Sequence, residues 1–126
     1  MTESSTNTTS SDLSVNADLP VFDRSDLLSR MMDNEELIKV VLDAFMADAS
    51  SLVADIELAG TENDPAALTL AAHSLKGAAA NISAMQLSDL SAQIEMLSRN
   101  NDLETAKNLV PRVRPLFENL QKVLDY

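Results

Sequence analysis

Apolar residues recur at helical spacing through most of this 126-residue chain, and the strict alternation typical of strands is missing. The stretch from Asp64 to Ser83 shows the pattern most clearly. It opens with Asp-Pro, a capping carboxylate followed by proline at the first helical position. Its apolar positions fall on one stripe, formed by Leu68, Ala71, Leu75, Ala78 and Ile82. The sequence therefore predicts a helix over residues 64–83.

Two helices are predicted before this one. A short helix over residues 24–32, capped by Asp23, would cover one end of the molecule. A long helix would begin at residues 33–34 and run to Ala59, where Gly60 would end it because glycine favours the backbone conformation found after helix ends. The core positions expected on the long helix are Leu37, Val40, Val41, Ala44, Phe45, Leu52, Ile56 and Ala59.

Two helical segments are predicted after it. The first runs over residues 85–100, with one apolar stripe (Leu87, Leu90, Ile94 and Leu97) and a solvent side (Ser88, Ala92, Glu95 and Arg99). The last segment follows the capping residue Asp102. Pro111 and Pro115 should bend or divide it, because each proline removes a backbone donor and crowds the preceding turn.

Amphipathic helices with short connections predict an all-α fold, an antiparallel up-and-down four-helix bundle with a short additional N-terminal helix. Residues 1–20 contrast with this pattern, since they are rich in Ser, Thr, Asn and Asp and contain almost nothing to bury. We expect them to form a flexible tail, and we expect one domain over residues 21–126.

Composition removes several classes of function. The formal charge of −11 disfavours nucleic acid and anionic membrane surfaces as partners, because both select basic patches. No apolar run approaches the roughly 18 residues that a membrane span needs, and no signal peptide is apparent, so we expect a cytoplasmic protein. With no cysteine, one histidine and only two glycines, the chain lacks the usual zinc spacings and any glycine-rich phosphate loop. We therefore expect no cofactor of its own.

The only histidine, His73, lies opposite the apolar stripe of its predicted helix. Thr69 and Leu70 lie one turn before it, Lys76 and Gly77 lie one turn after it, and Ala80 follows. A lone histidine in an alanine-rich helix is ordinarily a surface residue without chemistry. Gly77, however, costs a helix interior about 1 kcal/mol relative to alanine. Its presence suggests that a partner must approach the backbone beside His73.

The run His-Ser-Leu-Lys-Gly over residues 73–77, followed by small residues and Asn81-Ile82, resembles the signature of histidine-containing phosphotransfer (HPt) domains of bacterial multistep phosphorelays. The resemblance covers about residues 21–125. Its further parts are Val21-Phe22-Asp23, Leu27-Leu28, Arg30-Met31, Gln93-Ile94-Glu95, Arg99-Asn100-Asn101-Asp102, Leu109-Val110-Pro111 and Leu116-Phe117. The lead-in around Phe22 is similar to HPt domains of hybrid sensor kinases. Ser83 departs from the family pattern, which commonly has glycine there, and puts the local turn geometry in question.

The resemblance implies a four-helix bundle and a phosphoryl carrier without enzymatic turnover of its own. His73 would accept the phosphoryl group of a receiver-domain aspartate on its distal ring nitrogen and pass it to the aspartate of another receiver. Lys76 would stabilise the added charge, and Gly77 would let the loops of the receiver come close. The partners would be receiver domains of response regulators or hybrid kinases, and they would supply Mg²⁺. We expect the carrier to be a monomer.

The resemblance also indicates a receiver-docking surface made of Thr69, Leu70, Ala80, Glu95 and Arg99. The resemblance places Glu95 and Arg99 beside His73 on the neighbouring helix, which implies a role in orienting the ring or the receiver. They could instead be a weak surface ion pair four residues apart. Two alternative functions stay open at this point. The chain could be the phosphorylatable domain of a chemotaxis-type kinase, which accepts phosphate from a kinase ATP domain, or a helical adaptor bundle in which His73 is incidental.

Overall fold

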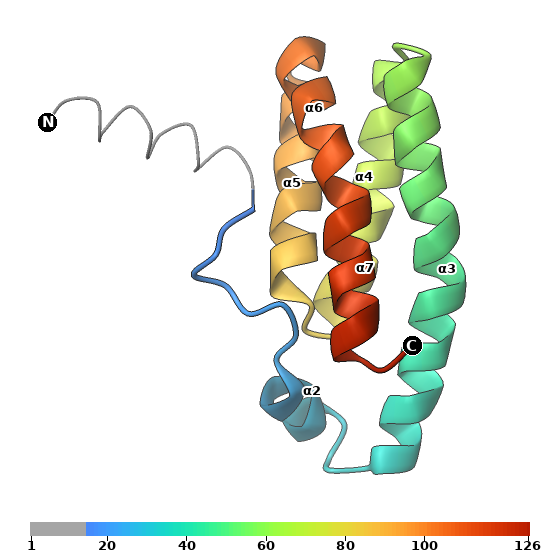
Figure 1. Cartoon of the computed structure of the whole chain (residues 1–126), viewed down its shortest axis with the longest axis vertical. Helices are drawn as coiled ribbons and strands as arrows, with labels where there is room; N and C mark the ends of the chain where they lie inside the picture. The colour runs from blue at the N-terminus through green and yellow to red at the C-terminus, as the bar shows by residue number, and fades with distance from the viewer. Residues whose placement is uncertain (1–14) are drawn as a thin grey trace, which may run out of the picture.

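Helices form the regular structure of the computed structural model, which describes residues 15–126 and has no strand in that range. In chain order the elements are α2 (Arg24–Arg30), α3 (Glu35–Thr61), α4 (Pro65–Asn81), α5 (Met85–Arg99), α6 (Leu103–Leu109), the 3₁₀ turn η1 (Val110–Arg112) and α7 (Val113–Val123). Helices α3, α4 and α5 and the joined pair α6–α7 run side by side, and α2 lies at one end (Figure 1). The predicted all-α bundle with a short extra N-terminal helix is confirmed.

Short polar side chains fix where the helices begin. The carboxylates of Asp23, Asp64 and Asp102 and the amide of Asn34 each accept the backbone N–H three residues further on, at 3.0–3.3 Å. These bonds satisfy donors that the first turn of a helix leaves unpaired. Each of the three caps predicted from the sequence as aspartate is confirmed.

The predicted end of α3 at Gly60 is wrong, because the helix continues to Thr61. Gly60 is buried inside the helix, and a Cβ built on it would meet Cγ2 of Val110 at 3.5 Å. The residue that turns the chain is Asn63, with a φ of 54°. Gly60 therefore lies against η1 at a distance where a Cβ would make ordinary van der Waals contact, and an asparagine adopts the left-handed conformation that ends the helix.

The core positions predicted for the first half of α3 are correct at Phe45, which is buried, and wrong at three others. Leu37 and Val40 are 42% and 62% exposed, and Ala44 is also exposed. The buried positions in this half are Ile38, Leu42 and Phe45, and the same stripe continues through Ala49 and Val53. This half of α3 carries two overlapping apolar stripes, and packing selects one of them: the ring of Phe45 lies 6.4 Å from that of Phe117 on α7.

The two prolines of the last segment have different effects. Pro111 lies in η1, where α6 ends and α7 has not begun, so the predicted division into two helices is confirmed. Pro115 lies in the first turn of α7 and does not interrupt it. The N–H groups of a first helical turn have no partner within the helix, so a proline there removes nothing that the helix uses.

The turn between α4 and α5 is held by the N-terminal part of the chain. Ser83 adopts a φ of 61° and is buried, and its hydroxyl donates to Asp26 and accepts from Arg30 of α2, both at 2.6 Å. The serine thus keeps the left-handed conformation that glycine adopts readily. Gln86 donates to the carbonyl groups of Leu19 and Pro20.

Residues 1–14 of the expected tail lie outside the described residues. Residues 15–20 contact the bundle, so the chain meets it before the expected boundary at residue 21. In the described part of the chain, no helix combines the length and apolar character needed to cross a membrane.

Candidate functional site

His73 lies on the outer face of α4, as the apolar pattern predicts. The buried residues of the helix are Leu68, Ala71, Ala72, Leu75 and Ala79. The side chain of His73 is 59% exposed. Its imidazole is therefore accessible to another macromolecule, while the backbone that carries it is fixed by the core.

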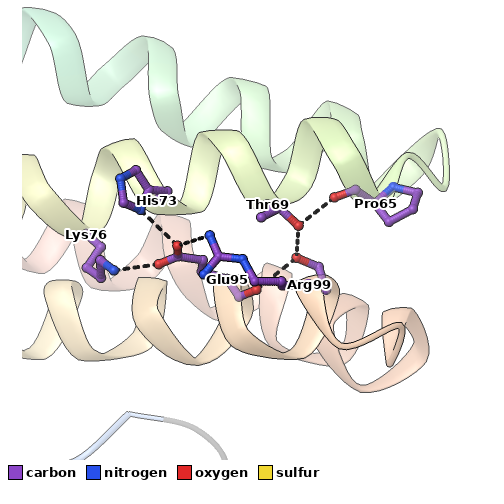
Figure 2. Close-up of polar contacts among 7 residues, drawn as sticks. Pro65, Thr69, His73, Lys76, Glu95 and Arg99 are labelled. Atoms are coloured by element: carbon purple, nitrogen blue, oxygen red, sulfur yellow. Dashed lines mark hydrogen bonds and ion pairs between the residues drawn. The ribbon is translucent and has the colours of Figure 1, made fainter.

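A carboxylate from the next helix lies beside the Nδ1 atom of the ring. Oε2 of Glu95, on α5, is 2.8 Å from Nδ1 of His73 (Figure 2). The side chain of Glu95 is only 4% exposed. The predicted placement of Glu95 on the solvent side of α5 is thus wrong, and Glu95 cannot form part of an exposed docking surface.

Two cations hold the buried carboxylate. Nζ of Lys76 lies 2.7 Å from Oε1 of Glu95, and a guanidinium nitrogen of Arg99 lies 2.7 Å from Oε2. The hydrogen bond from Lys76 is the main cause that lowers the pKa of Glu95 from 4.5 to about 2, with a further contribution from His73, although burial acts in the opposite direction. Glu95 is therefore ionised at neutral pH, and the expected Glu95–Arg99 pair is part of a larger cluster.

The ionised carboxylate decides the tautomer of the imidazole. A carboxylate can only accept hydrogen bonds, so Nδ1 must carry the hydrogen that it shares with Glu95. In the neutral ring the lone pair is then on Nε2, which lies on the side of the ring away from Glu95 (Figure 2). The site therefore presents an oriented nitrogen nucleophile at the surface.

Thr69 is turned toward α5 and is only partly exposed. Its hydroxyl donates to the carbonyl of Pro65 at 2.8 Å (Figure 2). The same hydroxyl lies 2.6 Å from the hydroxyl of Ser98. Leu70 and Ala80 do lie on the exposed face of α4 with His73, and Leu70 is 68% exposed. Of the expected docking residues, Leu70, Ala80 and Arg99 are at the surface.

Gly77 is also exposed, one turn after His73. A Cβ built on Gly77 would meet no atom within 4 Å, and its φ is not positive. Neither packing nor backbone conformation within the described chain requires glycine at this position. The absent side chain leaves the surface beside the imidazole flat.

Sequence reasoning missed the polar seam of α5. Ser88, Ser91, Glu95 and Ser98 are all buried. They recur every three or four residues, so a polar stripe beside the apolar stripe could have been recognised from spacing alone. What spacing could not reveal is that α4 supplies the partners for this stripe.

A model of the Hpt domain family matches residues 40–123, which include α4, α5 and the whole cluster around Glu95. The fold is similar to the crystal structure of histidine-containing phosphotransfer protein B (HptB) from Pseudomonas aeruginosa PAO1. That similarity has a TM-score of 0.77 and 26% sequence identity, and covers 84% of this chain and 92% of the other. No curated protein matches the chain.

Proposed function

Because this chain belongs to the Hpt domain family and is a histidine phosphotransfer protein of phosphorelay signalling, we propose that His73 is the residue that carries the phosphoryl group. The observation that supports this most strongly is the pairing of an exposed imidazole with a buried carboxylate at 2.8 Å. In the neutral ring it puts the lone pair on Nε2, which points outward, and attack on phosphorus requires such a lone pair.

In the proposed reaction, the lone pair of Nε2 attacks the phosphorus of an aspartyl phosphate on a receiver domain. The N–P bond forms as the bond between phosphorus and the aspartate oxygen breaks, and the carboxylate leaves with the electron pair. Nδ1 keeps its hydrogen, and ionised Glu95 balances the positive charge that develops on the ring. Transfer to a second receiver is the same step in reverse, so His73 is regenerated and the chain acts as a carrier.

The carrier needs little machinery beyond this, since phosphoryl transfer depends mainly on alignment and on neutralising charge. We expect the receiver to supply Mg²⁺. Lys76 can contribute because its ammonium has three hydrogens, of which the bond to Glu95 uses one, and the side chain is 35% exposed. We propose that Lys76 contacts the phosphoryl oxygens while it remains bound to Glu95.

We further propose that the receiver covers the exposed face around Leu70, Gly77 and Ala80. An apolar groove of about 260 Å³ adjoins this face between α3 and α4 and is lined by Val40, Val41, Ala44, Phe45, Asp48, Ala78, Asn81 and Ile82. Asn81 is eight residues from His73, or about 12 Å along the helix axis. An interface of about 800 Å² per partner has a radius of roughly 16 Å, so a receiver centred on His73 reaches the groove. We propose that an apolar side chain of the receiver occupies it.

The test is phosphotransfer from purified receivers that carry a labelled aspartyl phosphate, with the His73→Gln variant as the control. We expect the parent chain to take up acid-labile label and to pass it to a second receiver, whereas the variant takes up none and keeps its helical circular dichroism. Labelling by a kinase ATP domain but by no receiver would instead favour the chemotaxis-type alternative. No labelling by either donor would favour the adaptor.

A further inference from the structure

The seam between α4 and α5 contains buried hydroxyl groups where an apolar seam would suffice for packing. Ser88, Ser91 and Ser98 of α5 are all buried. Two of them reach across to α4: Ser98 Oγ lies 2.6 Å from Oγ1 of Thr69, and Ser88 Oγ donates to the carbonyl of Lys76 at 3.1 Å. Ser91 differs, because its hydroxyl bonds within α5, to the carbonyl of Leu87 at 2.8 Å.

These two cross-helix hydrogen bonds, here called ties, lie on either side of the pair formed by His73 and Glu95. On α4 they attach at Thr69 and Lys76, four residues before His73 and three after it. On α5 they come from Ser88 and Ser98, before and after Glu95. The contact between Nδ1 of His73 and Glu95 is therefore flanked on both sides by a hydrogen bond between α4 and α5.

We propose that Thr69, Ser88 and Ser98 are positioning residues for phosphotransfer: their cross-helix hydrogen bonds fix the register of α5 on α4, so that Glu95 meets Nδ1 of His73. The inference rests on the proposed function, in which His73 is the phosphoryl carrier. It assigns Thr69 to the support of the site and removes it from the docking surface.

Directional bonds are needed here because apolar side chains alone allow neighbouring helices to shift with little loss of buried area. A hydrogen bond loses its strength when donor and acceptor separate beyond about 3.5 Å, so a displacement of 1 Å would break the 2.8 Å contact between His73 and Glu95. Arg99, which lies on α5 with Glu95, would still hold the carboxylate. The imidazole would then exchange between both tautomers and would lose its fixed orientation.

The test uses the double variant Thr69→Val/Ser98→Ala, which removes both partners of one tie and replaces them with apolar groups of similar shape. Such a replacement leaves no buried donor or acceptor without a partner on either side chain, so folding should change little. Ser91→Ala is the matched control, because it removes a buried hydroxyl of the same helix that makes no bond to α4. Ser88→Ala tests the second tie independently.

Three quantities are measured for each variant: the unfolding midpoint, the ¹⁵N chemical shifts of the His73 imidazole, and the transfer rate from a phosphorylated receiver as a function of receiver concentration. For the double variant we expect an unfolding midpoint within about 4 °C of the parent, about 1 kcal/mol or less. We also expect a mixture of tautomers and a maximal transfer rate lowered on the order of tenfold, with an unchanged half-saturating concentration. Ser91→Ala should match the parent in tautomer and rate, and so should the single variant Thr69→Ser, which keeps the hydroxyl at position 69.

The parental tautomer and rate in both Ser88→Ala and the double variant would overturn the proposal. An equal change in Ser91→Ala would also overturn it, because the effect would then follow from any lost hydroxyl in the seam. The tautomer measurement needs no receiver. If His73 is not the phosphoryl carrier, the parent takes up no label at His73, yet the ¹⁵N shifts still report whether the ties position the ring.

Discussion

A buried carboxylate beneath an exposed imidazole separates His73 from an ordinary surface histidine. Burying an ionised carboxylate costs several kcal/mol unless donors compensate for the lost water. Three side chains do so for Glu95, namely His73, Lys76 and Arg99, and all three remain partly exposed themselves. The arrangement places two cations and an imidazole around one fixed negative charge in a protein whose formal charge is −11.

Replacing Glu95 with glutamine tests this arrangement at a single residue. The amide has nearly the same shape but no charge, and it can either accept from or donate to Nδ1, so the tautomer of His73 is no longer fixed. We expect the Glu95→Gln chain to fold and to accept phosphate at least tenfold more slowly, a change of about 1.4 kcal/mol in the barrier. Single-turnover transfer from a phosphorylated receiver measures the rate. A parental rate in this variant would show that the carboxylate has no part in the reaction.

At the scale of elements, α4 must present a flat surface on one side and pack on the other. The alanine-rich sequence meets both needs. The small buried residues Ala71, Ala72 and Ala79 let neighbouring helices approach closely. On the exposed side, Gly77 and Ala80 have no side chain or a small one, so little projects from the surface around His73. Among these, Gly77 is the one with a cost to the helix that its surroundings do not explain.

Substitutions at Gly77 separate helix stability from access to His73. Alanine at this exposed helical position should stabilise the isolated protein by up to about 1 kcal/mol, because it lowers the entropy of the unfolded chain. Glutamine should also fold, but its side chain would project into the space that the receiver occupies. We expect Gly77→Gln to bind the receiver more weakly and to transfer more slowly, while thermal unfolding stays near that of the parent. If Gly77→Gln folds and transfers at the parental rate, close approach is not the reason for the glycine.

The elements also show which features a sequence can reveal. The caps at Asp23, Asp64 and Asp102 and the division at Pro111 depend on residues a few positions apart, and all were predicted correctly. Burial of Glu95 depends on Lys76 and His73, about twenty residues earlier on another helix. The periodicity of α5 alone therefore placed it at the surface.

The same distinction explains the misplaced features of α3. Two apolar stripes overlap in its first half, and contacts with distant helices decide which one is buried. The local preference of Gly60 predicts a helix end, but the helix continues to Thr61 and the chain turns at Asn63. The sequence places His73 correctly at the surface, because apolar residues recur along the opposite side of α4 and determine which side of the helix packs on the core.

For the molecule as a whole, Glu95 links stability to pH. Its pKa is about 2 in the folded chain and 4.5 as an unperturbed group, so the ionised form stabilises the fold above about pH 4.5. This contribution is lost as the pH falls from 4.5 towards 2. Its full size is on the order of 3 kcal/mol.

Chemical unfolding of the parent and of Glu95→Gln at a series of pH values isolates this contribution, because the two chains share every other titrating carboxylate. We expect the difference in unfolding free energy between them to stay constant from pH 7 to pH 5 and to change in favour of the variant below pH 4.5. A difference that stays constant down to pH 2.5 would contradict the lowered pKa.

The central claim is that His73 carries the phosphoryl group on Nε2 while Nδ1 remains bound to Glu95. The most direct measurement is ³¹P and ¹⁵N NMR of ¹⁵N-histidine-labelled protein after transfer from a phosphorylated receiver, with His73→Gln treated in the same way. The account predicts a single phosphohistidine in the parent, with phosphorus bonded to Nε2, and no phosphorylated residue in the variant. Phosphorus bonded to Nδ1, or label that persists in His73→Gln, would contradict it.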